Sequence, residues 1–428
     1  MTWLVAEKIF GIGIAFVVSI FVVRYLGPER FGCLAFSQSL VLLIGAFPKL
    51  GLDNIIVRML VERPEDKTSI LGTAFALKLF SGLVSIIIVI VSVGFLNVSS
   101  VEKLMIVIIS GSFLFQSFDV IDYYFQSRVE SSRVVRIRLI KSVFSASIKI
   151  VLVWMEAPLV YFAWTSVLES IIRALGYIET YRRVRHGKPQ LSFSRFSYVS
   201  KQIASEMLKS SWPLIFSGLA LSVYMRMDQL MLRTMMDESS TGQYSAAVRI
   251  SESWLFLAVV ITSSLYPAVL NAKKMGDKIY MNRLQQFYDL MFWLPTAICA
   301  VIYFLSDTII FYAYGEQFAP AARVVAIYAW AGVFVFVITA SSRWYLTERY
   351  ETAIMFRAFS GAVTNVVLNY FLIPAYGIEG AAAATAISYG FMAVCYDALD
   401  PRGRVSFVLK LKTLFAPWRL IRKAVLYA

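Results

Sequence analysis

The stretch ILGTAFALKLFSGLVSIIIVIVSVGF, residues 70–95, contains a single charged residue, Lys78. A bilayer has a hydrocarbon core about 30 Å thick, and a helix of about 20 apolar residues crosses it. Similar runs of roughly 17 to 25 residues, separated by short polar gaps, recur about twelve times along the chain. We therefore predict an all-α polytopic membrane protein with about 12 transmembrane helices. The predicted spans are 9–26, 33–57, 70–95, 104–127, 138–155, 157–179, 212–235, 243–269, 288–312, 321–345, 352–373 and 379–397.

The composition also indicates a chain that lies almost wholly in a membrane. Apolar residues make up 59% of it and charged residues 16%, and the mean hydropathy is +0.68. A soluble protein carries about 25% charged residues. The net charge of +14 would suit a nucleic-acid partner. Basic loops facing an anionic cytoplasmic leaflet explain that charge better, so we predict no nucleic-acid binding.

Several chemistries are excluded by residues that the sequence lacks. His186 is the only histidine, which argues against a histidine metal site or a serine–histidine triad. The sequence has no GxxxxGK[ST] phosphate loop. We therefore predict no ATP hydrolysis, no cofactor and no enzymatic activity. Cys33, Cys299 and Cys395 lie far apart in apolar runs, and we predict that they are buried and form no disulfide.

The lysines and arginines predict the orientation of the helices. With the N-terminus inside, the inner segments and the C-terminal tail hold 30 of these residues, whereas the outer segments hold 5. Cytoplasmic loops are enriched in lysine and arginine, so both termini are predicted to be cytoplasmic. The basic and apolar residues after Asp400 predict a tail that docks on the anionic inner leaflet.

A long polar stretch separates six predicted spans from the other six. The halves are weakly similar: RYLGPERFG (24–32) and LRTMMDESSTG (232–242) each combine an arginine, an acidic turn and a glycine predicted to open the next helix. Six spans per half is an even number, so both halves enter the membrane from the same side, as in transporters that bind substrate between two bundles. The predicted parts are an N-terminal six-helix bundle (1–181), a basic cytoplasmic linker (182–211), a C-terminal six-helix bundle (212–399) and a basic cytoplasmic tail (400–428).

Eleven ionisable side chains fall deep within the predicted spans. Each costs about 2.5–3.5 kcal/mol there unless it meets a partner or water. One interpretation is a cationic lining that binds a diphosphate, for which the candidates are Arg226, Arg249, Lys78 and Lys149. The candidates for a coupling ion or for ion pairs are Asp228, Asp119, Asp122 and Glu252.

The alternative interpretation is pairing inside the bundle. Glu169 and Arg173 have the i,i+4 spacing that places both on one helix face, and we expect them to neutralise each other. Arg249 and Glu252 have the equivalent i,i+3 spacing. Asp119 and Asp122 lie near the end of their predicted helix, where they would cap the basic loop that follows.

Seven motifs occur in order over nearly the whole chain: RYLGPERFG (24–32), LGLDNIIVR (50–58), SFDVIDYYFQSRVES (117–131), YMRMDQLML (224–232), GQYSAAVRISE (242–252), SSLYPAVLNAKK (263–274) and LNYFLIPAYGIEGAAAAT (368–385). Together they resemble the Wzx-type O-antigen flippase, or polysaccharide-biosynthesis, family. That family belongs to the multidrug/oligosaccharidyl-lipid/polysaccharide exporter superfamily. Lys49 departs from the pattern, because the family usually has a neutral residue there.

The resemblance implies two six-helix bundles around a central cavity. It implies translocation of an undecaprenyl-diphosphate-linked oligosaccharide repeat unit across the bacterial inner membrane, for O-antigen, lipopolysaccharide or other surface polysaccharide biosynthesis. The implied partners are this lipid-linked oligosaccharide, membrane lipids, a polysaccharide polymerase, a chain-length regulator and a coupling cation.

Two other functions compete with this one. A cation-coupled multidrug or small-molecule antiporter of the same superfamily should favour deep acids, whereas the deep set here holds six cations and five acids. A membrane glycosyltransferase or polymerase would need large outer loops, and the predicted outer loops are short.

Overall fold

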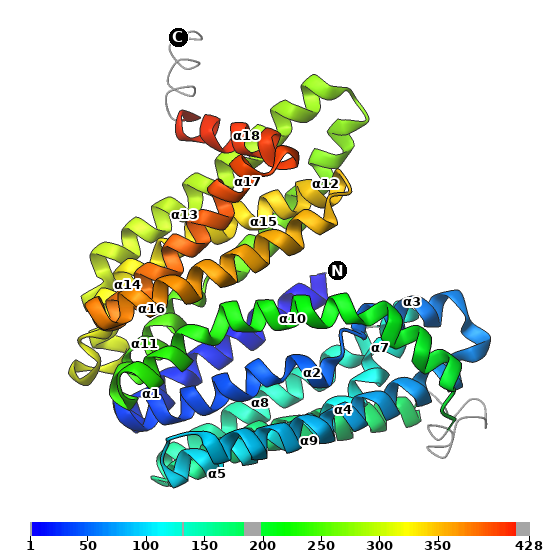
Figure 1. Ribbon diagram of the computed structural model, residues 1–428, viewed down its shortest axis with the longest axis vertical. Helices are drawn as coiled ribbons and strands as arrows, with labels where there is room; N and C mark the ends of the chain where they lie inside the picture. The colour runs from blue at the N-terminus through cyan, green and yellow to red at the C-terminus, as the bar shows by residue number, and fades with distance from the viewer. Residues whose placement is uncertain (1, 131, 184–197, 417–428) are drawn as a thin grey trace. The chain divides into compact units, whose positions relative to one another are not determined.

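The computed structural model describes residues 2–130, 132–183 and 198–416, and these are almost entirely helical, without a β-strand (Figure 1). The chain divides into two compact units, residues 1–230 and 231–428. The division falls inside a helix, whereas the sequence placed the boundary in the linker 182–211. The limits given above for the two six-helix bundles, the linker and the tail therefore stay predictions.

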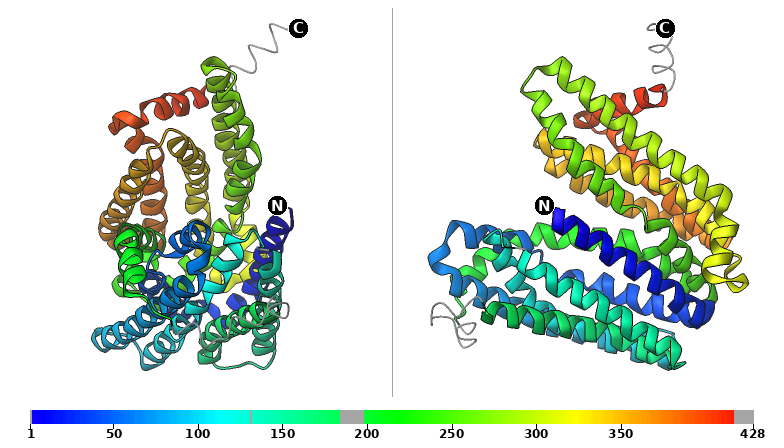
Figure 2. Two further views of the ribbon diagram at one scale, coloured as in Figure 1. Left: turned by 90° about the vertical axis from the view of Figure 1, so that its right-hand side faces the viewer. Right: turned by 180° about the vertical axis from the view of Figure 1, so that it is seen from behind.

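The first unit is a bundle of long helices that run side by side (Figures 1 and 2). Helices α5 and α8 of this unit each pack against both α1 and α9, so helices far apart in the sequence share one bundle. The elements are α1 (Thr2–Ile44), α2 (Ala46–Lys49), α3 (Asp53–Glu62), η1 (Pro64–Asp66), α4 (Lys67–Phe95), α5 (Ser100–Ser110), α6 (Ser112–Phe115), η2 (Gln116–Asp119), α7 (Val120–Ser127), α8 (Ser132–Trp154), α9 (Leu159–Arg183) and most of α10 (Lys201–Met235).

The second unit is a second helical bundle, centred on α13 and α15. Its core contains Tyr266, Leu284, Phe287, Phe336 and Tyr345, all buried. The elements are α11 (Glu238–Glu252), α12 (Phe256–Lys273), α13 (Asp277–Tyr314), η5 (Glu316–Phe318), α14 (Ala321–Ala329), α15 (Ala331–Thr347), α16 (Glu351–Gly390), the π-helical η6 (Phe391–Cys395), α17 (Tyr396–Leu399), η7 (Pro401–Gly403) and α18 (Arg404–Leu414).

The predicted spans fall mainly on helices. Eight helical segments among the described residues are long and apolar enough to cross a membrane. Two of these, Phe10–Glu62 and Glu351–Leu399, each contain two predicted spans. The first bends at Gly27 (φ 70°), just before Pro28, and the second bends at Gly377 (φ 58°). Such a positive φ is strained for a residue with a side chain, so glycine permits each bend.

The other two predicted spans lie on α8 and α10, helices of 23 and 35 residues that are more polar. Helix α10 begins at Lys201, so the end of the predicted linker is helical. Ile203 and Met207 of this part are buried in the core of the first unit. Glu206 accepts two hydrogen bonds from Arg63, at 2.8 and 2.9 Å. Residues 184–197 of the linker, with His186, lie outside the described part of the chain.

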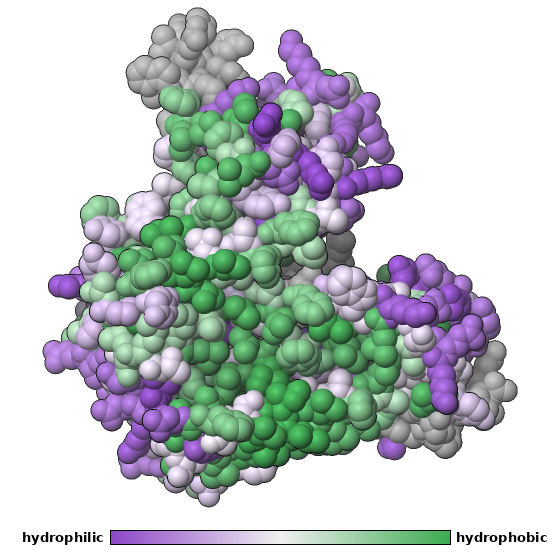
Figure 3. Space-filling model, viewed as in Figure 1, coloured by the Kyte–Doolittle hydropathy of each residue, from purple (hydrophilic) through white to green (hydrophobic). Residues whose placement is uncertain are grey.

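The sides of the helices expose apolar residues, and hydrophilic residues gather near the helix ends (Figure 3). Phe95 and Phe304, for example, are 87% and 80% exposed. Side chains of this kind suit contact with lipid, so the protein is a multi-pass membrane protein.

Two details differ from the sequence-based expectations. Helix α11 begins at Glu238, with Asp237 capping it through the amide of Ser240, so Gly242 lies inside the helix and does not open it. Of the three cysteines, only Cys299 is buried, whereas Cys395 is exposed; all three are free thiols, as predicted.

Candidate functional site

Lys78 lies at the centre of a buried charged site in the first unit. Its side chain is completely buried on α4, and its Nζ lies 3.1 Å from the hydroxyl of Tyr123 and 3.5 Å from Oδ1 of Asp53. Tyr123 in turn donates a hydrogen bond of 2.5 Å to the same carboxylate oxygen. The Asp53 side chain is 48% exposed, so the site consists of a buried ammonium behind an accessible carboxylate.

Asp119 and Asp122, predicted on one helix end, pair with two different helices. Asp119 of η2 lies 3.5 Å from Nε of Arg173 on α9. Asp122 of α7 accepts a hydrogen bond of 2.6 Å from Arg138 on α8. Arg138 lies on α8 and within the predicted span 138–155, so this pair joins two helices, and the expected capping of the basic loop stays a prediction.

Lys149 also has an acid partner, which the local sequence did not reveal. Its Nζ lies 2.7 Å from Glu169 on the neighbouring helix α9, and Ser145 and Lys141 of α8 contact the same carboxylate. The predicted pair of Glu169 and Arg173 is therefore wrong, because each pairs with another helix. The two side chains leave α9 toward different neighbours although they are one turn apart.

The remaining predicted site residues lie on α10 and α11. Arg226 is half-buried, and among the described residues it has no ion-pair partner. Asp228, two residues further, is buried at 5% exposure. Arg249 and Glu252 are both half-buried, and Glu252 accepts a hydrogen bond of 3.0 Å from Tyr328. Of the eight candidates, four form ion pairs within the first unit, and the other four lie on α10 and α11.

The sequence profile of the family described as polysaccharide biosynthesis protein matches residues 1–272. The chain belongs to this family. A protein of Haloferax volcanii, the probable low-salt glycan biosynthesis flippase Agl15, is similar at 25% identity over 181 residues. This match covers 40% of the chain and 37% of Agl15, so the chain matches little more than a third of that relative's length.

Solved structures with the same fold cover nearly the whole of this polysaccharide biosynthesis protein. The lipid II flippase MurJ in an inward closed conformation matches with a TM-score of 0.76 at 15% identity, over 97% of the chain and 91% of MurJ. An inward-facing multidrug resistance MATE family transporter of the MOP superfamily matches with a TM-score of 0.72 at 15% identity, over 94% and 95%. These likenesses confirm the predicted fold class, a polytopic all-α protein with two six-helix bundles.

The structure also contains buried polar groups that the sequence analysis missed. Asp53 lies in the motif LGLDNIIVR and Tyr123 in SFDVIDYYFQSRVES, so a carboxylate and a hydroxyl within apolar motifs were the available signals. Asn365, Asn369 and Thr385 are buried on α16, where Asn369 donates to Asn365 at 3.0 Å and Asn365 lies 3.3 Å from the Thr385 hydroxyl. Three polar side chains within a predicted pair of spans were the signal there.

A further buried cluster joins the tail helix α18 to the second unit. Asp397 is fully buried and accepts hydrogen bonds from Lys410 at 2.5 Å and from Tyr345 at 2.9 Å. Arg357, only 2% exposed, lies 3.9 Å from the same carboxylate and donates to Ser341 at 2.8 Å. Lys410 was predicted to face the leaflet with the other basic residues of the tail. It is instead buried because Asp397 and the carbonyl of Ala393 bind its ammonium.

Proposed function

We propose that the protein is a flippase. It moves an undecaprenyl-diphosphate-linked oligosaccharide repeat unit across the bacterial inner membrane, for O-antigen or another surface polysaccharide. The observation that carries the proposal is family membership over residues 1–272 together with a fold like that of a lipid II flippase. The name of the Haloferax relative, a probable glycan biosynthesis flippase, supports the same class of substrate.

Charge is the property that such a substrate demands of its path. A diphosphate carries about two negative charges, which cannot enter hydrocarbon unless fixed cations meet them. Lys78 and Lys149 are already paired with Asp53 and Glu169, so their charge is largely compensated. Arg226 has no such acid among the described residues, and its half-buried guanidinium is suited to bind phosphate oxygens through two parallel hydrogen bonds. We assign Arg226 as a phosphate-binding residue, and propose the same role for Arg249 because of its place in the motif GQYSAAVRISE.

The acids would then have a separate role. A coupling cation, or ion pairs that change during transport, would use the four acids Asp228, Asp119, Asp122 and Glu252. Arg173 and Arg138 lie on Asp119 and Asp122 in this conformation, so a cation could bind there only after these pairs separate.

The proposed orientation has both termini in the cytoplasm, as the basic segments predict. In this arrangement the substrate enters from the leaflet in which it is made. The polymerase and the chain-length regulator use it on the other side of the membrane.

Replacement of Arg226 tests the proposal directly. Hydrogen bonds to charged groups contribute roughly 1.5–3 kcal/mol, so Arg226→Ala should lower export by about 10- to 150-fold. Arg226→Lys should recover part of it, because a point charge remains. Export is measured as surface polysaccharide in cells that lack their own flippase, with the amount of each variant in the membrane determined in parallel. Arg30→Ala, which removes an exposed arginine outside the predicted spans, is the matched control.

The result that would contradict this assignment is also clear. Full export from a normally inserted Arg226→Ala/Arg249→Ala double variant would exclude the two arginines as the phosphate site. If Arg226→Ala chiefly lowers the amount of protein, Arg226 acts in folding instead.

A second candidate function is a cation-coupled multidrug antiporter, because a MATE transporter shares the fold. The two functions are separated by transport in proteoliposomes that contain the purified protein. Uptake of a cationic dye in exchange for protons or sodium, without movement of a lipid-linked oligosaccharide, would favour the antiporter.

A further inference from the structure

Helix α18 lies where the membrane boundary should be. The preceding segment, which is apolar enough to span the membrane, ends at Leu399, and α18 begins five residues later at Arg404. Helix α18 packs on α13 near residue 288, where the predicted span of that helix begins. There Tyr288 contacts Ser406 at 2.9 Å, and Trp293 donates to the carbonyl of Thr413 at 3.0 Å.

Helix α18 has a protein-facing side and an exposed side that is largely apolar. Ser406, Leu409, Lys410 and Thr413 are buried in the second unit. The exposed side carries a set of large apolar residues, each between 42% and 66% exposed: Val405, Val408, Leu411, Leu414 and Phe415. Exposure of such an apolar face to water is unfavourable. We therefore expect the exposed side of α18 to lie against the acyl region of the adjoining leaflet.

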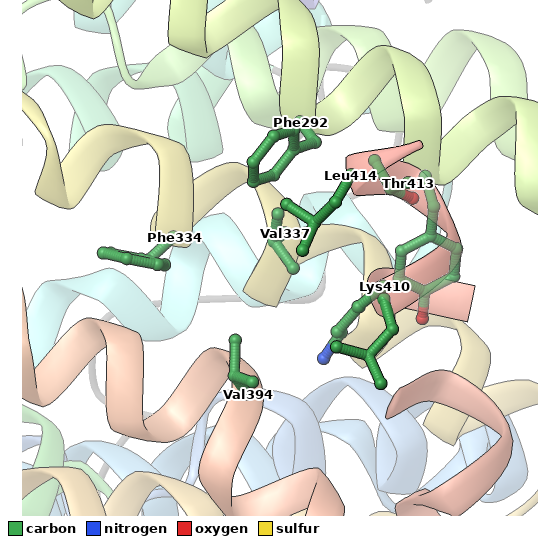
Figure 4. Close-up of a pocket in the computed structure, with 9 residues that line it drawn as sticks. Phe292, Phe334, Val337, Val394, Lys410, Thr413 and Leu414 are labelled. Carbon is green, nitrogen blue, oxygen red and sulfur yellow. The ribbon is translucent and has the colours of Figure 1, made fainter. Parts of the chain in front are cut away.

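An apolar pocket opens beneath this face (Figure 4). It has a volume of about 80 Å³ and is open at one side, between α13, α15, η6 and α18. Phe292, Phe334, Val337 and Val394 form its walls, and Leu414 of α18 also borders it. The amine of Lys410 lies at the side that Val394 borders and is the one charged group in the lining.

The surroundings of the pocket carry an excess of positive charge. Inside, Arg357 and Lys410 share the single carboxylate of Asp397. Outside, Arg404 and Lys412 lie on the exposed side of α18. Lys410 donates hydrogen bonds to Asp397 and to a backbone carbonyl, and an ammonium has three donors. The chemistry that fits an apolar slot within a basic frame is a hydrocarbon chain attached to an anion.

We propose that this pocket binds the end of one acyl chain of an anionic phospholipid from the leaflet beside α18, with the headgroup over Arg404 and Lys412. The chain would gain from leaving water, and the excess positive charge would select the anionic headgroup. A bound lipid would hold α18 against the bundle. The site would therefore make the second unit sensitive to the lipid composition of that leaflet.

Native mass spectrometry of the delipidated full-length protein tests the proposal. The probes are phosphatidylglycerol and phosphatidylcholine with identical chains, added at increasing concentration. We expect one phosphatidylglycerol molecule to bind at least fivefold more tightly than phosphatidylcholine. Arg404→Gln and Lys412→Gln should each weaken phosphatidylglycerol binding about fivefold.

Substitutions that fill the pocket distinguish lipid binding in the pocket from lipid binding elsewhere on the surface. Leu414→Trp and Val394→Phe should lower phosphatidylglycerol binding at least tenfold, because they fill the space for the chain. Val408→Trp adds the same bulk to the exposed side of α18 outside the pocket and should leave binding unchanged. Leu414 is 52% exposed, so its replacement should fold even if Val394→Phe does not. Equal affinity for the two lipids, or undiminished binding to Leu414→Trp, would overturn the proposal.

Discussion

The buried carboxylate of Asp397 should be a major contributor to the stability of the second unit. Asp397→Asn leaves the charges of Lys410 and Arg357 in place without an acid to meet them. Removing one partner of a buried ion pair costs about 3–5 kcal/mol. For a unit of this size each kcal/mol lowers the melting temperature by about 2–4 °C, so the loss should be about 6–20 °C. Thermal unfolding of the purified protein in detergent measures it, with the exposed Asp307→Asn as the matched control.

A second substitution checks the cause. Asp397→Asn raises the net charge of the cluster by one, and Lys410→Met lowers it by one, so the double variant has the original net charge. Much of the lost stability should return in the double variant, so its loss should be smaller than the sum of the losses in the two single variants. If the double variant is as unstable as Asp397→Asn, uncompensated charge is not the cause and the reasoning is refuted.

The ion pair of Asp397 and Lys410 also predicts how the stability of Asp397→Asn depends on pH. Burial lowers the pKa of Lys410 to about 8, against an ordinary value of 10.5, although Asp397 opposes the shift. Without Asp397 the folded-state pKa of Lys410 must fall further, so between that lower pKa and pH 8 the wild type holds a proton that the variant has lost. The stability of Asp397→Asn relative to wild type should therefore improve as the pH rises towards 8 and change little above it. An unchanged difference would contradict the assignment of the charge to Lys410.

Three further predictions concern topology, energy and a surface ion pair. Reporter fusions after Ser240 and after Pro320 should be periplasmic and a fusion at Gly187 cytoplasmic; a periplasmic signal at Gly187 would overturn the orientation. Transport in proteoliposomes should need no ATP but should need an ion gradient or a membrane potential, and equal rates without either would leave a passive flippase. The hydrogen bonds from Arg63 lower the pKa of Glu206 below its ordinary 4.5. The stability lost in Arg63→Gln should thus be seen above that pH and should vanish on acidification, as followed by thermal unfolding.

The positions of the helices could be predicted from the sequence because the signal is local. A run such as residues 70–95 must satisfy its backbone hydrogen bonds internally once it lies in lipid, and a helix does this whatever its neighbours are. The bends at Gly27 and Gly377 also occur at local signals, a glycine near a proline.

The partners of the charged residues depended on the tertiary structure. Spacing alone paired Glu169 with Arg173, but Glu169 binds Lys149 across two helices and Arg173 lies on Asp119. The reason is that contact between helices depends on the rotation of each helix about its axis and on its shift along the neighbour. Both are set by the packing of many side chains over the whole bundle. Lys410 illustrates the same limit, since its periodicity suggests a leaflet contact and only the fold brings Asp397 within 2.5 Å of it.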